Sequence, residues 1–189
     1  MSGAAMGLAR EKPWPLEEFL SWEREQPERF ELIDGQPVAM TGGTQAHDLI
    51  KTNLAAALRA ALRGGPCRPG GSDLKVITGN GRVRYPDALI DCGPFRPDAD
   101  TASDPVAVFE VLSRSTSWVD LTRKVQDYGA TPGLDTYVAI SQDELRVAVF
   151  RRSGDRLVQS QLLTRLEDGV AAGPATLGLA AIYEDIFPR

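Results

Sequence analysis

Hydrophobic and polar residues recur along the chain with two different periods. A helical spacing of apolar residues predicts helices over residues 16–26, 45–63, 120–130 and 179–187. Alternation, or a short apolar run, predicts strands over residues 28–34, 36–41, 72–78, 82–91, 106–112, 135–141, 144–152 and 157–164. Asp34-Gly35 and Gly79-Asn80-Gly81 are typical of tight hairpin turns, whereas residues 64–71 and 94–105 predict loops.

The order of these elements indicates an α/β (α+β) fold. From residue 45 onward the order is helix, three strands, helix, strand, and the last strand follows a helical crossover. The strand over 106–112 is almost continuously apolar, which favours a central place with both faces covered. We expect a mixed central sheet flanked by helices, with an N-terminal helix and hairpin before it and further strands after it. At 189 residues this is a single domain over 16–189, preceded by a flexible segment over 1–15.

Composition and charge restrict the function classes. Hydrophobic residues make up 42% and charged residues 25% of the chain, as in ordinary soluble globular proteins. The net charge of -5 argues against sequence-blind electrostatic binding to DNA or to an acidic membrane. No apolar run approaches the ~18 residues of a membrane span, so we expect no membrane partner. Cys67 and Cys92 are too few for a disulfide framework or a four-cysteine zinc site. We expect reduced thiols and a cytoplasmic protein.

Glu110 is the most informative residue, because it lies in the middle of the apolar strand over 106–112. An isolated carboxylate is costly to bury. Glu110 therefore requires a cation, a metal ion or hydrogen-bond donors at a strand end. A buried ion pair, or an edge position that faces water, would also explain it.

Two further residues gain interest from their positions. Asp87 follows a proline, which indicates a strand edge or a bulge of the kind that reorients side chains next to active sites. A solvated or turn-capping aspartate is the simpler interpretation. In the helix over 120–130, Lys124 lies ~40° from Tyr128 and so borders the face that packs on the sheet. There it would reach a carboxylate pair or extend to water.

Together these motifs resemble the PD-(D/E)XK nuclease superfamily. The matching features are Pro86-Asp87, Glu110 near the end of the next strand, and the order of helix, three strands, helix, strand. Leu112 stands where that superfamily usually has a lysine. This departure is similar to the Uma-two family of restriction endonucleases, in which the lysine comes from the following helix, here Lys124.

The resemblance implies a restriction endonuclease-like αβββαβ core and an endonuclease that hydrolyses phosphodiester bonds in DNA. Asp87, Glu110 and the backbone carbonyl of Val111 would bind Mg²⁺, with Mn²⁺ as a second ion. Lys124 would assist the attacking water. DNA is the implied partner, and we expect a homodimer, which would permit a cut in each strand.

Four residues are weaker candidates for supporting these groups or contacting substrate: Glu31, His47, Asp73 and Arg114. His47 could equally be a packed, hydrogen-bonded histidine of the first core helix. Arg114 stands where the family usually has a proline, and it would contact phosphate or mark a loop difference. A basic groove that holds DNA would draw on Arg82, Arg84, Arg114 and Arg123.

Other enzyme classes find little support. The sequence has no Gly-x-Ser-x-Gly motif for a serine hydrolase that would use His47 as its base. It has no Gly-Lys-Ser/Thr of a phosphate-binding P-loop. One alternative stays open, namely a catalytically inactive member of the same fold that acts as a DNA-binding or protein-interaction module.

Overall fold

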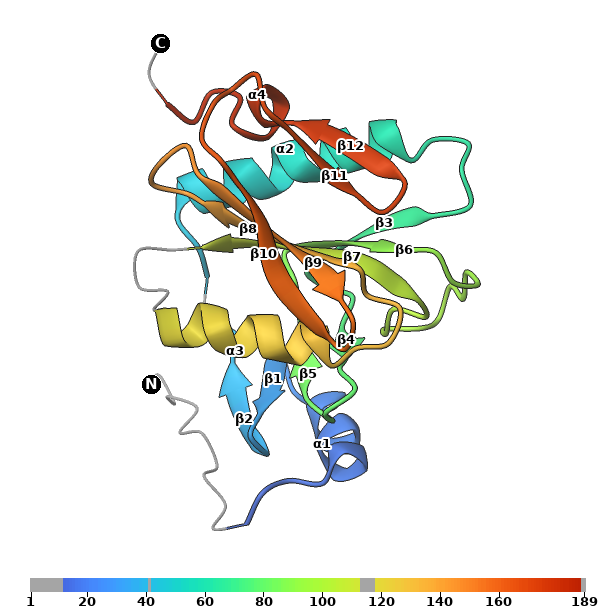
Figure 1. Ribbon diagram of the computed structural model, residues 1–189. Coiled ribbons are helices and arrows are strands. Elements are labelled where there is room, and N and C mark those ends of the chain that lie inside the picture. Colours follow the sequence, from blue (N-terminus) through green and yellow to red (C-terminus); the bar gives the residue numbers. More distant parts are fainter. Residues whose placement is uncertain (1–11, 41, 113–117, 188–189) are drawn as a thin grey trace.

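The computed structural model describes residues 12–40, 42–112 and 118–187 (Figure 1). Its helices are α1 (Leu16–Glu23), α2 (Gln45–Ala61), α3 (Trp118–Gly129) and α4 (Leu179–Ile182). Its strands are β1 (Phe30–Ile33), β2 (Gln36–Ala39), β3 (Arg68–Gly71), β4 (Val76–Ile77), β5 (Val83–Arg84), β6 (Ala88–Asp91), β7 (Pro105–Leu112), β8 (Thr136–Ser141), β9 (Val147–Ser153), β10 (Arg156–Leu163), β11 (Gly169–Ala172) and β12 (Ala175–Gly178).

A six-stranded mixed sheet forms the centre of the molecule, in the order β10-β9-β8-β7-β6-β3. β7 and β8 are parallel, and the other neighbouring pairs of this sheet are antiparallel. α2 lies on one face of the sheet and α3 on the other (Figure 1). The expected mixed sheet flanked by helices is confirmed, and the apolar strand β7 is central within it.

Each of the two helices closes its own apolar core. Leu54 of α2 packs in a core that contains Phe109 of β7. Tyr128 of α3 packs in a core on the opposite face, which contains Val108 of β7. Because successive side chains of a strand point to opposite faces, Glu110 shares the α3 face with Val108.

A smaller sheet, in the order β2-β1-β5-β4, lies with α1 in the lower part of Figure 1. Its apolar cluster includes Phe19 of α1 and Phe30 of β1. Trp14 belongs to the same cluster, and its backbone N–H donates to the carbonyl of Gly35 at 2.8 Å. The end of the predicted flexible segment over 1–15 is therefore packed, whereas residues 1–11 lie outside the described residues.

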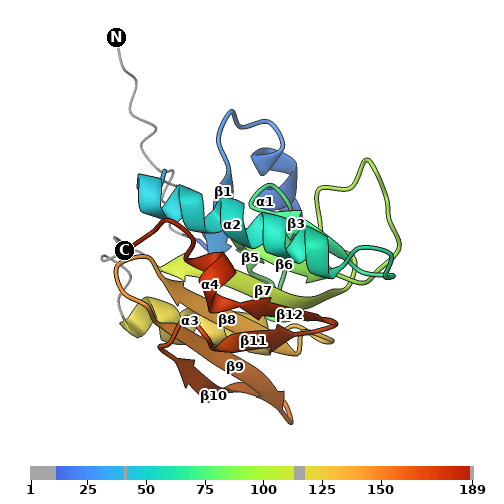
Figure 2. The same cartoon turned by 90° about the horizontal axis from the view of Figure 1, so that it is seen from above.

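The C-terminal part of the chain covers α2. The hairpin of β11 and β12 and the short helix α4 lie next to α2 (Figure 2), and Val170, Leu177 and Leu179 join its core. This hairpin was not predicted from the sequence, because its strands are short and consist largely of glycine and alanine. The last helix was predicted to run to residue 187, whereas α4 ends at Ile182.

The strands before β7 differ from the prediction in two ways. Residues 68–71 form β3, the first strand of the central sheet, where a loop was predicted. Its sequence, Arg-Pro-Gly-Gly, shows no alternation of apolar residues. Backbone pairing with β6 holds this strand in place, so it forms without a side-chain pattern that could be recognised. The predicted strand over 82–91 is broken at Pro86-Asp87, so that β5 joins the smaller sheet and β6 the central one. The predicted strand over 72–78 shortens to β4 of the smaller sheet.

The prediction of reduced thiols is wrong, since Cys67 and Cys92 form a disulfide. Arg68 pairs with Asp91 across the antiparallel strands β3 and β6. Cys67 precedes Arg68 and Cys92 follows Asp91, so the two cysteines lie opposite each other. Disulfides persist mainly in oxidising compartments, and the cytoplasmic location stays a prediction. No helix within the described ranges is long and apolar enough to cross a bilayer.

Candidate active site

A pocket of about 420 Å³ opens where β7 approaches its C-terminal end. Several elements contribute to it, namely α2, α3, β1, β7 and the break between β5 and β6. The predicted residues that line it are Glu31, His47, Asp87, Glu110, Val111 and Lys124. The pocket therefore brings together the three residues that the sequence analysis placed at the centre of the chemistry.

Asp87 lies at the point where the chain passes from the smaller sheet to the central one. Its Oδ2 accepts the backbone N–H of Val111 at 2.7 Å and lies 3.4 Å from Nε2 of His47. Nζ of Lys51 lies 3.7 Å from Oδ1. Burial alone would raise the pKa of this carboxyl, but the hydrogen bonds from His47 and Val111 outweigh it, so the pKa lies below the usual value. Asp87 therefore remains ionised.

Glu110 is nearly fully buried on the α3 side of β7. Its Oε2 accepts a hydrogen bond from Nζ of Lys124 at 2.9 Å, and its Oε1 accepts one from the hydroxyl of Tyr128 at 2.7 Å. Burial raises the pKa of Glu110, the ammonium of Lys124 opposes this rise, and the negative charge of Asp87 adds to it. The net effect is a raised pKa, so an additional cation beside this carboxylate would be stabilising.

Lys124 lies on α3, one turn before Tyr128, at the border of the helix face that packs on the sheet. This placement confirms the helical spacing used to select it. Burial alone would lower the pKa of the ammonium, but the charge of Glu110 outweighs it and the pKa is raised. Lys124 is therefore a permanent cation in the wall of the pocket.

The supporting candidates are distributed less evenly. Glu31 lines the pocket and is fixed by Arg84 at 2.8 Å and by the N–H of Tyr85 at 3.1 Å. The imidazole of His47 contacts Asp87, and the backbone N–H of His47 donates to the helix-capping hydroxyl of Thr44. The structure does not bring Asp73 into the site, since its side chain is 91% exposed. Arg114 lies outside the described residues.

The expected basic groove is not formed by its described members. The guanidinium of Arg84 is fully buried and donates to Asp127 and Glu31. Arg82 is paired with the buried Asp127 and with Asp34 at the surface. Arg123 is partly exposed, lies 3.9 Å from Asp34 and does not line the pocket. Sequence analysis could not detect these pairs, because each joins residues that are distant along the chain.

Two residues have contacts at the site that were not predicted from the sequence: Lys51, which lines the pocket, and Tyr128, which is buried beside Glu110. Lys51 follows His47 by one helical turn, so both side chains lie on one face of α2. That spacing was the available signal for Lys51. Tyr128 had been placed only in the apolar stripe of its helix, and its hydroxyl contact with Glu110 gave no sequence signal.

The charge balance of the pocket fits a divalent cation. Among the described residues that line it, four are acidic (Glu31, Asp48, Asp87 and Glu110) and two are lysines. No group of three or more His, Cys, Asp or Glu side chains in the described ranges is arranged to hold a metal. An ion would thus use Asp87, Glu110 and a backbone carbonyl. Val111 offers that carbonyl, since its N–H already faces Asp87 and both groups of a strand residue point to the same strand edge.

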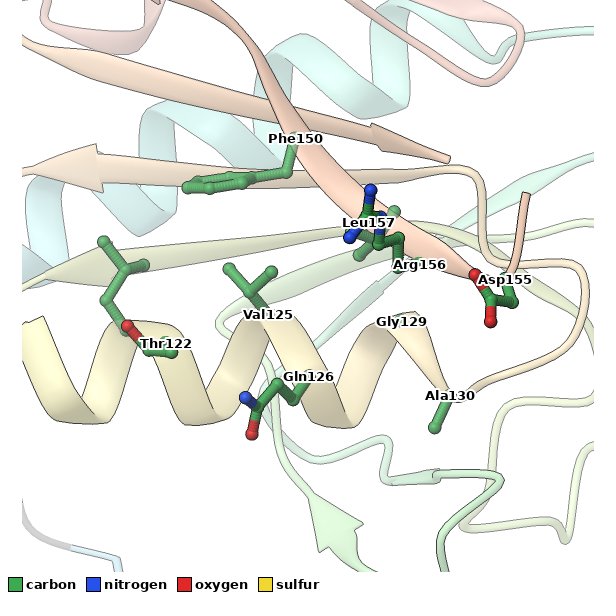
Figure 3. Close-up of a pocket in the computed structure, with 10 residues that line it drawn as sticks. Thr122, Val125, Gln126, Gly129, Ala130, Phe150, Asp155, Arg156 and Leu157 are labelled. Carbon is green, nitrogen blue, oxygen red and sulfur yellow. The ribbon is translucent and has the colours of Figure 1, made fainter. Parts of the chain in front are cut away.

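A second cavity, of about 470 Å³, lies between α3 and β10 (Figure 3). Val125 of α3, Phe150 of β9 and Leu157 of β10 give it a largely apolar lining. Asp155 is its one described carboxylate. It is slightly larger than the first cavity, but it lacks the paired acids and the lysines that phosphate chemistry requires.

The fold and this pocket define a restriction endonuclease-like protein. A crystal structure described as "a putative nuclease belonging to DUF820", from Anabaena variabilis ATCC 29413, matches 93% of this chain and 100% of its own, with a TM-score of 0.74 and 18% identity. Residues 16–181 match the family model "Uma2: Putative restriction endonuclease", and the chain belongs to that family. The resemblance stated from the sequence is thereby confirmed.

Two relatives come from Synechocystis sp. (strain ATCC 27184 / PCC 6803 / Kazusa). The uncharacterized protein slr1290 is 35% identical over 141 residues, which are 74% of this chain and 74% of that protein. The uncharacterized protein sll1609 is 28% identical over 165 residues, which are 85% of this chain and 92% of that protein. The similarity therefore extends over most of the domain.

Proposed function

We propose that this protein is a metal-dependent endonuclease that hydrolyses phosphodiester bonds in DNA. The observation that carries the proposal is the convergence of Asp87, Glu110 and Lys124, from three separate segments, in one open pocket. Membership of the family described as "Putative restriction endonuclease" supports the same reaction.

Mg²⁺, with Mn²⁺ as an alternative, is the ion that this oxygen-rich set of donors fits. Asp87, Glu110 and the carbonyl of Val111 would hold it. When bound, the ion would polarise the scissile phosphate and lower the pKa of a bound water. The pKa of Glu110 is raised, chiefly by burial and further by the charge of Asp87, so a cation bound beside this carboxylate would stabilise its ionised form.

The side chains around the carboxylates would position the reacting groups. Lys124, held 2.9 Å from Glu110, would orient the attacking water and stabilise the negative charge that develops on the phosphate. Tyr128 would fix the orientation of Glu110, and His47 that of Asp87. We further propose a homodimer, because two copies would supply one such pocket for each DNA strand.

The decisive experiment is cleavage of plasmid and linear DNA with Mg²⁺, with Mn²⁺ and with EDTA. Asp87→Asn, Glu110→Gln and Lys124→Met should each lower the rate by at least about 10²-fold, because each removes a charge at the reacting centre. Asp73→Asn is the matched control, since it removes an exposed carboxylate outside the pocket and should cleave as the wild type does. Sedimentation in the same buffers would test the dimer.

Full activity of any pocket variant would remove that residue from the mechanism. Binding of DNA by the wild type without cleavage under all metal conditions would favour the alternative, a catalytically inactive DNA-binding module. Calorimetry of Mg²⁺ with and without DNA then separates a lost metal site from a lost substrate site.

A further inference from the structure

Lys51 is a second lysine of the pocket, and the reaction described so far gives it no role. It extends from α2, one turn after His47, toward the carboxylate of Asp87. Its Nζ lies 3.3 Å from the hydroxyl oxygen of Ser72, which follows the edge strand β3. Lys51 and Ser72 therefore approach each other from two elements at the rim of the pocket.

The two lysines of the pocket are held very differently. Nζ of Lys124 makes a 2.9 Å hydrogen bond to a buried carboxylate. Nζ of Lys51 lies 3.7 Å from Oδ1 of Asp87, which is beyond the length of a charge-assisted hydrogen bond. The side chain of Lys51 is also the more exposed of the two, 27% against 16%. Lys51 thus keeps donors available for a ligand that enters the pocket.

A cation at Asp87 would change the partner that Lys51 requires. In the proposed reaction a divalent ion takes the charge of Asp87, so the attraction between Asp87 and Lys51 is replaced by repulsion between ion and ammonium. The ammonium then gains most from an anion inside the pocket. The hydroxyl of Ser72, which accepts from Lys51, still has its own proton to donate to such an anion.

We propose that Lys51 and Ser72 form a subsite for a backbone phosphate of the nucleic acid, next to the phosphate that is cleaved. The inference rests on the proposed function and deepens it, because it assigns separate tasks to the two lysines. Lys124 acts at the reacting centre, and Lys51 binds the strand. The acidic chain as a whole attracts DNA poorly, so a local cation of this kind contributes a large share of the attraction.

The first test measures the salt dependence of DNA binding with Ca²⁺ in place of Mg²⁺. Lys51→Met keeps the length of the side chain without its charge, and it should lower the slope of log K against log salt concentration by about 0.9, the value for one lost phosphate contact. Lys51→Arg should retain the slope. Lys12→Met, which removes an exposed lysine that does not line the pocket, should also retain it. An unchanged slope for Lys51→Met would overturn the inference.

The second test does not depend on cleavage. The chain has four lysines, Lys12, Lys51, Lys75 and Lys124, so ¹³Cε labelling of lysine gives few NMR signals. Addition of dithymidine monophosphate to the Mg²⁺-treated protein should shift the signal of Lys51, beyond any shift by Mg²⁺ alone, and leave Lys12 and Lys75 unchanged. The Lys51→Arg variant assigns the signal.

The two proposals fail in distinguishable ways. A shift of Lys51 by the phosphodiester, in a protein that cleaves no DNA, would retain the phosphate subsite and reject the nuclease activity. DNA cleavage with no shift of Lys51 and no change of the salt slope would retain the nuclease and reject the subsite.

Discussion

Two glutamates of this protein each accept one hydrogen bond from a lysine and one from a tyrosine. One is Glu110 of the pocket. The other is Glu23 at the end of α1, which accepts a hydrogen bond from Nζ of Lys75 at 2.7 Å and one from the hydroxyl of Tyr85 at 2.8 Å. We call Glu23, Lys75 and Tyr85 the sealed trio, because the side chains of its glutamate and lysine are each only 1% exposed.

The pocket trio, Glu110, Lys124 and Tyr128, has the same chemistry in a different setting. Its glutamate and lysine line a cavity of about 420 Å³ together with the second carboxylate of Asp87. Glu23 and Lys75 line none of the pockets found among the described residues, although Asp100 also approaches Lys75, at 3.1 Å. A buried ion pair therefore does not identify a functional site by itself. What distinguishes the pocket trio is the cavity beside it, which the second carboxylate of Asp87 also lines.

Removal of the lysine should separate the two trios most clearly. Lys75→Met leaves Glu23 buried and without its cation, which costs about 3–5 kcal/mol of unfolding free energy. Lys124→Met should cost less than about 2 kcal/mol, because water in the cavity can reach Glu110. Urea unfolding measures both. Equal losses in the two variants would contradict the distinction between sealed and open trios.

Removal of the tyrosine hydroxyl should lower stability less than Lys75→Met does, and it should affect activity in only one of the two trios. Tyr85→Phe and Tyr128→Phe each delete one hydrogen bond to a glutamate, worth about 1.5–3 kcal/mol. DNA cleavage should weaken only in Tyr128→Phe, since this hydroxyl orients the proposed metal ligand. A parallel series of unfolding and cleavage assays checks both outcomes. An equal loss of cleavage in Tyr85→Phe would show that both hydroxyls affect cleavage through stability, and not through the orientation of the proposed metal ligand.

The pH dependence of Mg²⁺ binding should give the smallest effect. The pKa of Glu110 is raised, chiefly by burial, so its proton competes with the metal at a higher pH than an ordinary glutamate, near 4.3, would allow. The affinity for Mg²⁺ should fall as the pH decreases toward the raised pKa of Glu110, and binding of the ion should release protons. Calorimetry in buffers of different ionisation enthalpy measures the release. Proton release that persists in Glu110→Gln would assign it to another group.

The sequence predicted those parts of the fold that depend on side-chain pattern. The apolar strand around Glu110 and the helix that carries Lys124 lie where the periodicity placed them. β3 was not predicted, because its side chains show no hydrophobic pattern. Backbone hydrogen bonds to β6 and the adjacent disulfide hold this strand in place. The break at Pro86-Asp87 was recognised as a bulge or edge, but the change of sheet at that point depends on contacts with β1 that are distant in sequence.

The candidate site followed a similar division. Glu110 was found because it departs from its local apolar pattern, whereas Asp87 and Lys124 were selected through the resemblance of the combined motifs to a nuclease family. Glu23 and Lys75 are just as deeply buried but gave no signal, since their pairing spans 52 residues and neither lies in a conspicuous apolar run. The sequence therefore indicated Glu110 and Lys124 of the pocket trio and missed the sealed trio, and it could not show which of the two borders a cavity.

The disulfide between Cys67 and Cys92 closes a covalent ring around the excursion into the smaller sheet. Asp87 and Ser72 both lie on this ring, and so does the turn at Gly79–Gly81. A protease that cuts once in that turn would leave two fragments that still migrate as one molecule in electrophoresis without reductant. The pocket thus keeps its connection to both halves of the chain after backbone cleavage.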